Sequence, residues 1–183
     1  MTGRRPLVVV VTGSECTGKT TLALGLARRF AAPCASEFAR EYLDSKNAPL
    51  GAGDVEPIAR GQIAAEEGAV ALAEELAVKD TDLVSTIVYA RHYYGSCPPW
   101  VEREAVARLG DLYLLLHPDV PWVADGLHRD RPADRDLLHG LFERRLESLG
   151  ARIVHITGDW PARHRLALDA VQSQLALWGQ TRV

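Results

Sequence analysis

The sequence predicts an α/β fold, with a parallel sheet of about five strands and helices on both of its faces. Short apolar segments alternate with longer amphipathic segments along the 183 residues. The apolar segments are continuous, as in residues 7–11, and strands that are buried on both faces have this pattern. Ligands of such folds bind beyond the carboxyl ends of the strands, so we expect the functional site at that edge.

Composition favours one globular domain spanning residues 1–183, with 47% hydrophobic and 25% charged residues. A formal net charge of −3 gives no reason to expect binding to nucleic acid or to an acidic membrane. No apolar segment is long enough for a signal peptide or a membrane span, and the three cysteines have neither paired nor metal-binding spacing. We therefore expect a cytoplasmic protein, and its oligomeric state stays open.

Residues 13–20 match the phosphate-binding pattern G-x-x-x-x-G-K-[ST], with a predicted strand before them and a predicted helix, residues 21–30, after them. Gly13 and Gly18 can adopt backbone angles that let successive N–H groups converge on phosphate oxygens. The helix adds the positive end of its dipole. The alternative is a chance glycine-rich turn. The residues expected to hold a nucleoside triphosphate are Gly13, Ser14, Glu15, Cys16, Thr17, Gly18, Lys19, Thr20 and Thr21.

Within this loop, Lys19 is a point charge for the β- and γ-phosphates, and Thr20 offers a hydroxyl ligand to Mg²⁺. Cys16 is expected to be a small tolerated loop residue, and a redox switch is the less favoured alternative. The sequence thus predicts a site for a nucleotide with its magnesium ion.

The next elements lead to two acidic strand ends. Residues 32–36 form a short predicted strand that ends at Glu37. Asp54 is a suitable N-cap for an amphipathic helix, which is expected to continue to Leu76. Residues 77–82 are predicted as the third strand, with acidic residues at its carboxyl end.

The second half continues the alternation of helices and apolar strands. Gly95 and Gly110 are expected to end two helices, because glycine is favoured just beyond a helix C-terminus. The predicted order is helix 83–94, helix 101–109, strand 111–117, loop 118–134, helix 135–149, strand 152–157 and a terminal helix with Pro161 in its first turn.

Asp80 and Asp82 end the third predicted strand, where P-loop enzymes carry a metal-binding carboxylate. In an extended segment both would point the same way, with Thr81 opposite. One could organise Mg²⁺ while the other binds a substrate hydroxyl, and a solvated turn is the alternative. Glu37 could act as a general base, with Arg40 on the same helix face, unless the two form only a weak surface ion pair.

Two further groups are candidates for substrate binding. The loop at about residues 118–135 carries dense charge of both signs, so it is either a lid that delivers an arginine or a solvated loop. Tyr93 and Trp122 could stack on a heteroaromatic base, although most aromatic residues serve packing. Trp160 is expected to be structural. His128 is expected to be a loop residue, and no other histidine has metal-binding spacing.

Together these segments resemble the bacterial nicotinamide riboside kinase domain of the NadR proteins. The likeness covers most of the chain, and its most specific parts are the last two of the four matching segments. These segments are residues 13–20, Ser36-Glu37-Phe38-Ala39-Arg40-Glu41-Tyr42, Asp80-Thr81-Asp82 and Pro121-Trp122-Val123-Ala124-Asp125-Gly126-Leu127.

The resemblance implies a P-loop kinase fold that uses ATP and Mg²⁺ to phosphorylate the ribose 5′-hydroxyl of nicotinamide riboside, giving nicotinamide mononucleotide. It implies that Glu37 is a candidate base, that Asp80 or Asp82 serves the metal or the ribose, and that Arg129 or Arg131 serves the lid. Taking these arguments together, the residues expected to contact the substrate are Glu37, Arg40, Asp80, Asp82, Tyr93, Trp122 and Asp125. No DNA-binding or adenylyltransferase segment precedes the domain, so we expect the kinase activity alone.

Two positions depart from the family pattern, since Ser36 stands where relatives have tryptophan and His128 where they have arginine. The first departure leaves open a kinase for another nucleoside or a small alcohol. A nucleotide-operated switch is a further alternative, but the chain has no clear Asn-Lys-x-Asp segment and its arginine-rich loop better suits a self-contained kinase.

Overall fold

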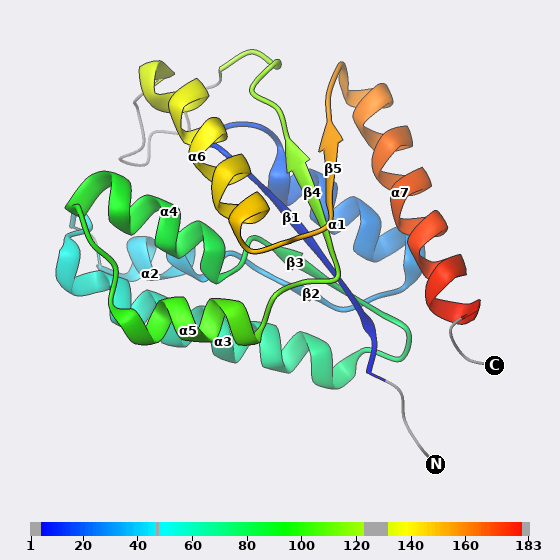
Figure 1. Cartoon of the computed structure of the whole chain (residues 1–183), viewed down its shortest axis with the longest axis horizontal. Coiled ribbons are helices and arrows are strands. Elements are labelled where there is room, and N and C mark those ends of the chain that lie inside the picture. Colours follow the sequence, from blue (N-terminus) through cyan, green and yellow to red (C-terminus); the bar gives the residue numbers. More distant parts are fainter. Residues whose placement is uncertain (1–4, 47, 123–131, 181–183) are drawn as a thin grey trace.

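The sheet of this protein consists of five parallel strands in the order β2-β3-β1-β4-β5 (Figure 1). The computed structural model of the chain describes residues 5–46, 48–122 and 132–180. The predicted parallel α/β fold is confirmed. The strands are β1 (Leu7–Gly13), β2 (Cys34–Ala35), β3 (Leu76–Asp80), β4 (Leu112–Leu116) and β5 (Ile153–Ile156).

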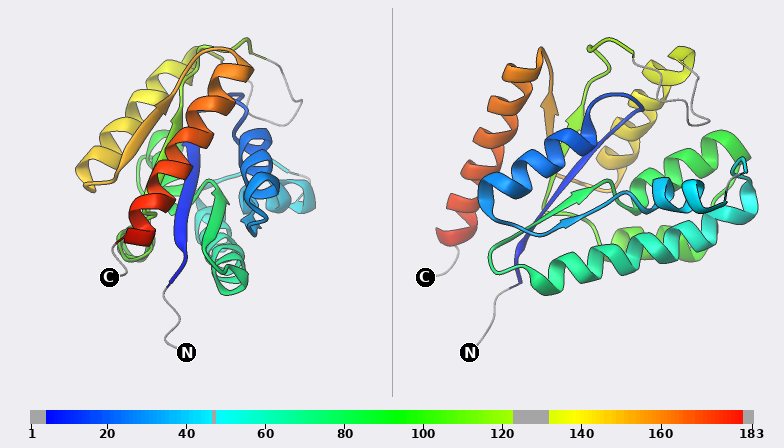
Figure 2. Two further views of the ribbon diagram at one scale, coloured as in Figure 1. Left: turned by 90° about the vertical axis from the view of Figure 1, so that its right-hand side faces the viewer. Right: turned by 180° about the vertical axis from the view of Figure 1, so that it is seen from behind.

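Helices cover both faces of the sheet, as the views in Figures 1 and 2 show. Helices α1 and α7 pack on one face, and α4 and α6 pack on the other. Helices α3 and α5 pack against α4. Their bounds are α1 (Lys19–Phe30), α2 (Phe38–Lys46), α3 (Val55–Leu72), α4 (Leu83–Tyr94), α5 (Pro99–Ala107), α6 (Arg135–Ser148) and α7 (Trp160–Gln180).

Strand β1 occupies the centre of the core, and all seven of its residues are buried. Val9 and Val11 face α1 and α7, whereas Val8 and Val10 face α4 and α6. Because both faces are covered, the strand needs apolar residues at successive positions, which explains its unbroken valine run. Full burial of each such side chain contributes roughly 1.5–3 kcal/mol relative to exposure.

Among the described helices, none has the length and apolar character needed to cross a membrane.

Two predicted boundaries around β3 were wrong, and both affect the site. Helix α3 ends at Leu72, and Leu76 belongs to β3, where it pairs with Leu7. The strand ends at Asp80, because Thr81 has a φ of 67°, in the left-handed region. Asp82 is instead the N-cap of α4, and its side chain accepts a hydrogen bond from the Val84 N–H group. The expectation that Asp80 and Asp82 point the same way therefore fails.

A buried ion pair lies beside this junction. Lys79 Nζ is 2.6 Å from Glu66 Oε2, and the two side chains are 4% and 3% exposed. Burial raises the pKa of Glu66 to about 7, although the charge of Lys79 opposes that shift. Asp82 Oδ2 accepts a 2.5 Å hydrogen bond from the Tyr113 hydroxyl. These side chains tie α3, β3 and β4 to the start of α4.

We predict that Lys79→Met destabilises the protein by about 3–5 kcal/mol, because it leaves the carboxylate of Glu66 buried without its cation. Urea unfolding at a pH near 8, where Glu66 is largely ionised, measures the effect. The double variant Lys79→Met/Glu66→Leu is the matched control and should recover most of the loss. If the single variant unfolds within about 1 kcal/mol of the native chain, this ion pair is not needed for stability.

Candidate functional site

The loop formed by residues 13–20, hereafter the P-loop, connects β1 to α1 and requires both of its glycines. Gly13 has a φ of 136° and Gly18 a φ of 84°. A Cβ atom on Gly13 would lie 2.7 Å from the Leu116 carbonyl oxygen, and one on Gly18 would lie 2.4 Å from the Trp160 ring. The backbone angle therefore disfavours a side chain at both positions, and at Gly13 the Leu116 backbone also leaves no space for one.

Lys19 is buried and its ammonium group is fixed to the P-loop. Its Nζ donates a 2.8 Å hydrogen bond to the Ser14 carbonyl oxygen, which also accepts a 2.9 Å bond from the Thr17 hydroxyl. The positive charge is thus held beside the backbone that precedes α1. An anion at the start of α1 would also meet the positive end of the helix dipole.

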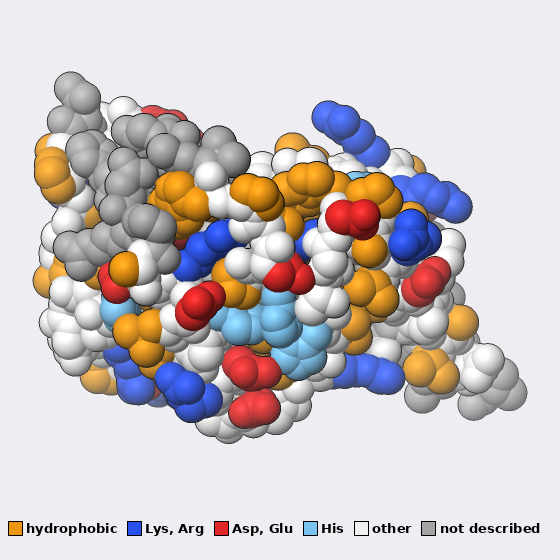
Figure 3. Space-filling view, turned by 90° about the horizontal axis from the view of Figure 1, so that it is seen from above, with side chains coloured by type: hydrophobic (Ala, Val, Ile, Leu, Met, Phe, Trp, Pro, Cys, Tyr) orange, Lys and Arg blue, Asp and Glu red, His pale blue; other side chains and the backbone are white. Residues whose placement is uncertain are grey.

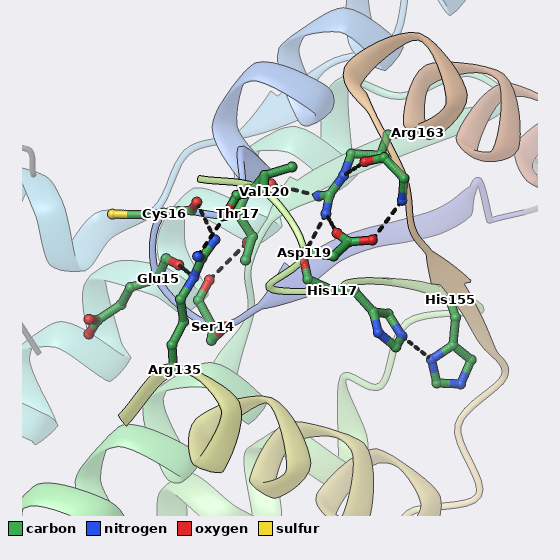
Figure 4. A network of polar contacts seen from close by, with 11 residues as sticks. Ser14, Glu15, Cys16, Thr17, His117, Asp119, Val120, Arg135, His155 and Arg163 are labelled. Atoms are coloured by element: carbon green, nitrogen blue, oxygen red, sulfur yellow. Dashed lines mark hydrogen bonds and ion pairs between the residues drawn. The ribbon is translucent and has the colours of Figure 1, made fainter. Parts of the chain in front are cut away.

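Arg135, the first residue of α6, holds the P-loop from one side. Its guanidinium donates hydrogen bonds to the carbonyl oxygens of Glu15 (3.2 Å), Cys16 (2.9 Å) and Val120 (2.8 Å) (Figure 4). The residue is 8% exposed. A buried arginine with several acceptors gives the loop a rigid support, because removing it would leave carbonyl groups without partners.

Arg163 of α7 supports the P-loop from the other side (Figure 4). It donates to the carbonyl oxygens of Thr17 (3.0 Å), Gly158 (2.8 Å) and His117 (2.6 Å), and it forms an ion pair with Asp119. Both arginines donate hydrogen bonds to carbonyl oxygens of the loop. These contacts therefore do not involve the N–H groups of the loop. The sequence did not predict a role for either residue, because a lone arginine within a helix carries no motif.

Asp80 is the last residue of β3, and three other predicted site residues influence the pKa of its carboxyl group. Burial raises its pKa, and the negative charge of Glu37 acts in the same direction. A hydrogen bond from Thr20 and the positive charge of Lys19 oppose this shift. The structure therefore brings together the P-loop, Asp80 and Glu37, as the strand-end argument predicts.

The same residues fit a magnesium ion. Asp80 Oδ1 is buried and has no hydrogen-bond partner within the described ranges. The Thr20 hydroxyl is bonded to the same carboxyl group. A carboxylate and a hydroxyl oxygen are the kinds of ligand that Mg²⁺ prefers, usually together with water and phosphate oxygens.

A cavity of about 590 Å³ adjoins the P-loop and lies among α2, α3 and α4. This volume falls within the range typical of small-molecule sites, roughly 300–1,000 Å³. Both Glu15 of the P-loop and Glu37 line it. Apolar side chains and three tyrosines supply much of the remaining wall, including Leu43, Leu50, Val55, Ile58, Tyr89, Tyr93 and Tyr94.

The tyrosines of α4 present aromatic surface to this cavity. The rings of Tyr89 and Tyr93 are stacked, with centroids 6.0 Å apart and planes 4° apart. The Tyr93 hydroxyl donates a 3.4 Å hydrogen bond to Glu15 Oε1. Tyr93 thereby connects the cavity wall with the P-loop, which places an aromatic ring where the sequence predicts substrate binding.

Other predicted residues lie elsewhere. The Asp82 carboxylate is directed to Tyr113 and the start of α4, so its predicted contact with substrate is not supported. Trp122 lies against Arg135, with 5.8 Å between the guanidinium carbon and the ring centre, and is not among the described residues that line the cavity. Asp125, Arg129 and Arg131 fall outside the described residues.

The Glu37–Arg40 pair combines features of both alternatives. Arg40 Nε lies 3.9 Å from Glu37 Oε2, so the surface ion pair exists. The Arg40 side chain is 47% exposed, however, whereas that of Glu37 is 7% exposed and belongs to the cavity wall. Glu37 is therefore positioned for more than a surface ion pair.

Trp160, which the sequence predicts to be structural, lies against the P-loop. Its ring packs on Gly18 and also contacts Arg163, whose guanidinium carbon is 5.6 Å from the ring centre. The residue is nevertheless 50% exposed. The signal for this position was its place just after the last strand, because carboxyl strand ends meet at one edge of a parallel sheet.

Comparisons of the sequence with known proteins identify the family and relatives of this chain. Residues 8–163 match the sequence model described as an AAA domain. The trifunctional NAD biosynthesis/regulator protein NadR of Salmonella typhimurium is 30% identical over 177 residues, which cover 93% of this chain and 43% of that protein. The NadR protein of Escherichia coli is 31% identical over 173 residues, covering 91% and 42%. The chain thus spans less than half the length of these curated relatives, and the predicted resemblance to NadR is confirmed.

Solved structures support the same relationship. A crystal structure of NadR protein in complex with NR has a TM-score of 0.84 and 29% identity, covering 92% of this chain and 51% of that chain. A thymidylate kinase from Ehrlichia chaffeensis has a TM-score of 0.65 at 13% identity, covering 93% and 99%, and it bears on the fold alone. The fold is therefore that of the P-loop kinases.

We predict that Gly13→Ala destabilises the protein by about 1–3 kcal/mol and weakens ATP binding, because the strained backbone and the Leu116 carbonyl leave no room for a methyl group. Thermal unfolding with and without ATP measures both effects. Gly68→Ala is the control, since Gly68 lies in α3 with open space around it, and it should stabilise by about 0.5–1 kcal/mol. Equal behaviour of the two variants would contradict the steric argument.

Proposed function

The chain belongs to the AAA domain family, and we propose that it is an ATP-dependent kinase that phosphorylates the ribose 5′-hydroxyl of nicotinamide riboside, giving nicotinamide mononucleotide. The observation that carries this proposal is that Glu15 of the P-loop and Glu37 line the same cavity. A phosphate donor at the P-loop and an alcohol in the cavity would then meet beside one carboxylate. The similarity to a NadR structure in complex with NR supports nicotinamide riboside as the acceptor.

Lys19 and the P-loop N–H groups would bind the β- and γ-phosphates of ATP. Their positive charge is arranged before the reaction, so it stabilises negative charge on the transferred phosphoryl group without further reorganisation. Thr20 and Asp80 would hold Mg²⁺, which neutralises phosphate charge when it is bound. Arg135 and Arg163 would act indirectly by keeping the loop in its binding conformation.

Glu37 would accept the proton of the 5′-hydroxyl. Its low exposure and its place in the cavity wall put a carboxylate where the hydroxyl enters. Arg40 would help to keep that carboxylate charged. The stacked rings of Tyr89 and Tyr93 and the apolar wall would contact the base and ribose. The roles of Asp125, Arg129 and Arg131 in a lid, and of residues 1–183 as one domain, stay predictions.

A kinase for another nucleoside or a small alcohol is the second candidate. Ser36 favours this alternative, because the family pattern expected from the sequence has an aromatic residue there and serine offers no ring to stack on a base. The tyrosine-lined cavity would also accept other heteroaromatic rings. A nucleotide-operated switch fits less well, because it gives no reason for a substrate-sized cavity between the P-loop and Glu37.

We predict that the purified protein, supplied with ATP and Mg²⁺, releases ADP fastest with nicotinamide riboside in a panel of ribosides. Mass spectrometry should find the 5′-monophosphate of that riboside. Nicotinamide and 5′-deoxynicotinamide riboside are matched controls, because neither carries the accepting hydroxyl. Faster phosphorylation of another riboside would identify that riboside as the preferred acceptor. A rate of ADP release that does not increase with any riboside would contradict the kinase proposal.

We predict that Lys19→Ala abolishes turnover, whereas Glu37→Gln slows phosphoryl transfer by about 10²-fold or more and preserves ATP binding. The physical reason is that the amide keeps the size of Glu37 but cannot accept the proton. Steady-state rates and ATP affinity together separate the two effects. Glu41→Gln, at an exposed position of α2, is the control and should keep native rates. Native turnover in Glu37→Gln would exclude Glu37 as the base.

A further inference from the structure

Three histidines from distant parts of the chain meet beside the carboxyl ends of β4 and β5. His117 directly follows β4, His155 lies in β5 and His139 lies in α6. Each offers a ring nitrogen, and these three atoms all lie within 4.8 Å of one another. Figure 3 shows histidine side chains gathered at the surface with acidic side chains beside them. We call these three residues the histidine cluster.

Sheet register and helix periodicity create the cluster. The His117 N–H group donates to the Ile156 carbonyl oxygen (3.0 Å), which sets the end of β4 beside β5. Helix α6 packs over this part of the sheet, and its residues His139 and Glu143, one turn apart, lie on the same side of the helix. Glu143 Oε1 is 3.6 Å from His155 Nε2, which adds a carboxylate next to the three imidazoles.

We propose that His117, His139 and His155 form a binding site for a divalent transition-metal ion such as Zn²⁺, with Glu143 as a neighbouring carboxylate. Imidazole nitrogens suit zinc, nickel and copper, whereas magnesium and calcium prefer oxygen ligands. The ion at this site would therefore differ in kind from the magnesium ion expected at Thr20 and Asp80.

Distances within the cluster are compatible with one ion. His117 Nε2 and His155 Nδ1 are 2.9 Å apart, and the ring centres of His117 and His139 are 4.2 Å apart. Two nitrogens bound to one tetrahedral zinc ion at 2.0–2.1 Å are separated by about 3.3 Å. The first pair needs to open by only a few tenths of an ångström, which side-chain rotation can supply.

The surroundings favour an ion over a purely structural hydrogen bond. His139 Nδ1 is buried and makes no hydrogen bond of normal geometry in the described part of the chain, although the Leu116 backbone interacts with this ring. Such an orphaned nitrogen is costly unless a ligand satisfies it. The His155 side chain is 44% exposed, so an ion can reach the cluster from solvent.

The test is a titration of the metal-free full chain with Zn²⁺ by calorimetry and with Co²⁺ by visible absorption. We expect one ion per chain with micromolar or tighter affinity, the absorption spectrum of nitrogen-bound Co²⁺, and a higher melting temperature with Zn²⁺. A large excess of Mg²⁺ should not displace the ion. Absence of saturable binding at micromolar concentrations would overturn the proposal.

Two substitutions locate the ion. His155→Ala, at the exposed member of the cluster, should fold normally and lower the affinity at least tenfold. His164→Ala removes a histidine of α7 outside the cluster and should bind like the native chain. If instead Asp80→Asn abolishes Zn²⁺ binding and His155→Ala does not, the ion occupies the magnesium position and the histidine cluster is not a metal site.

Discussion

Two buried guanidinium groups hold the P-loop from opposite sides, and the candidate site depends on this support. Arg135 binds the carbonyl oxygens of Glu15 and Cys16, and Arg163 binds that of Thr17. A loop with glycines at φ values of 136° and 84° gains its shape from such contacts, since neither residue has a side chain to pack. The helices that carry the arginines, α6 and α7, cover opposite faces of the sheet, so the whole fold fixes this loop.

Asp80, the last residue of β3, and Asp82 have different surroundings because the backbone turns at Thr81 between them. Thr81 leaves the extended conformation, so Asp80 stays with Thr20 and Lys19 while Asp82 turns to cap α4 and to bind Tyr113. Asp82 then belongs to the same buried surroundings as Lys79 and Glu66. Asp80 therefore faces the P-loop, and Asp82 stabilises the junction between β3 and α4 that positions it.

The sequence predicted those features that depend on local pattern. The valine run before Gly13 indicated a central buried strand, and the P-loop spacing indicated its phosphate loop. It could not predict the turn at Thr81, because a positive φ at a β-branched residue is held by tertiary contacts. Arg135, Arg163 and the histidine cluster were missed for a related reason. Their partners lie far away in the sequence and become neighbours only through the sheet order and the packing of α6 and α7.

The central claim is that a phosphate donor at the P-loop and an alcohol beside Glu37 share one cavity. A crystal structure of the chain with nicotinamide riboside and a non-hydrolysable ATP analogue tests it most directly. The account predicts the 5′-oxygen within about 2.6–3.2 Å of the Glu37 carboxylate and facing the γ-phosphate held by Lys19. A riboside bound away from Glu37, or phosphates bound away from residues 13–20, would contradict it.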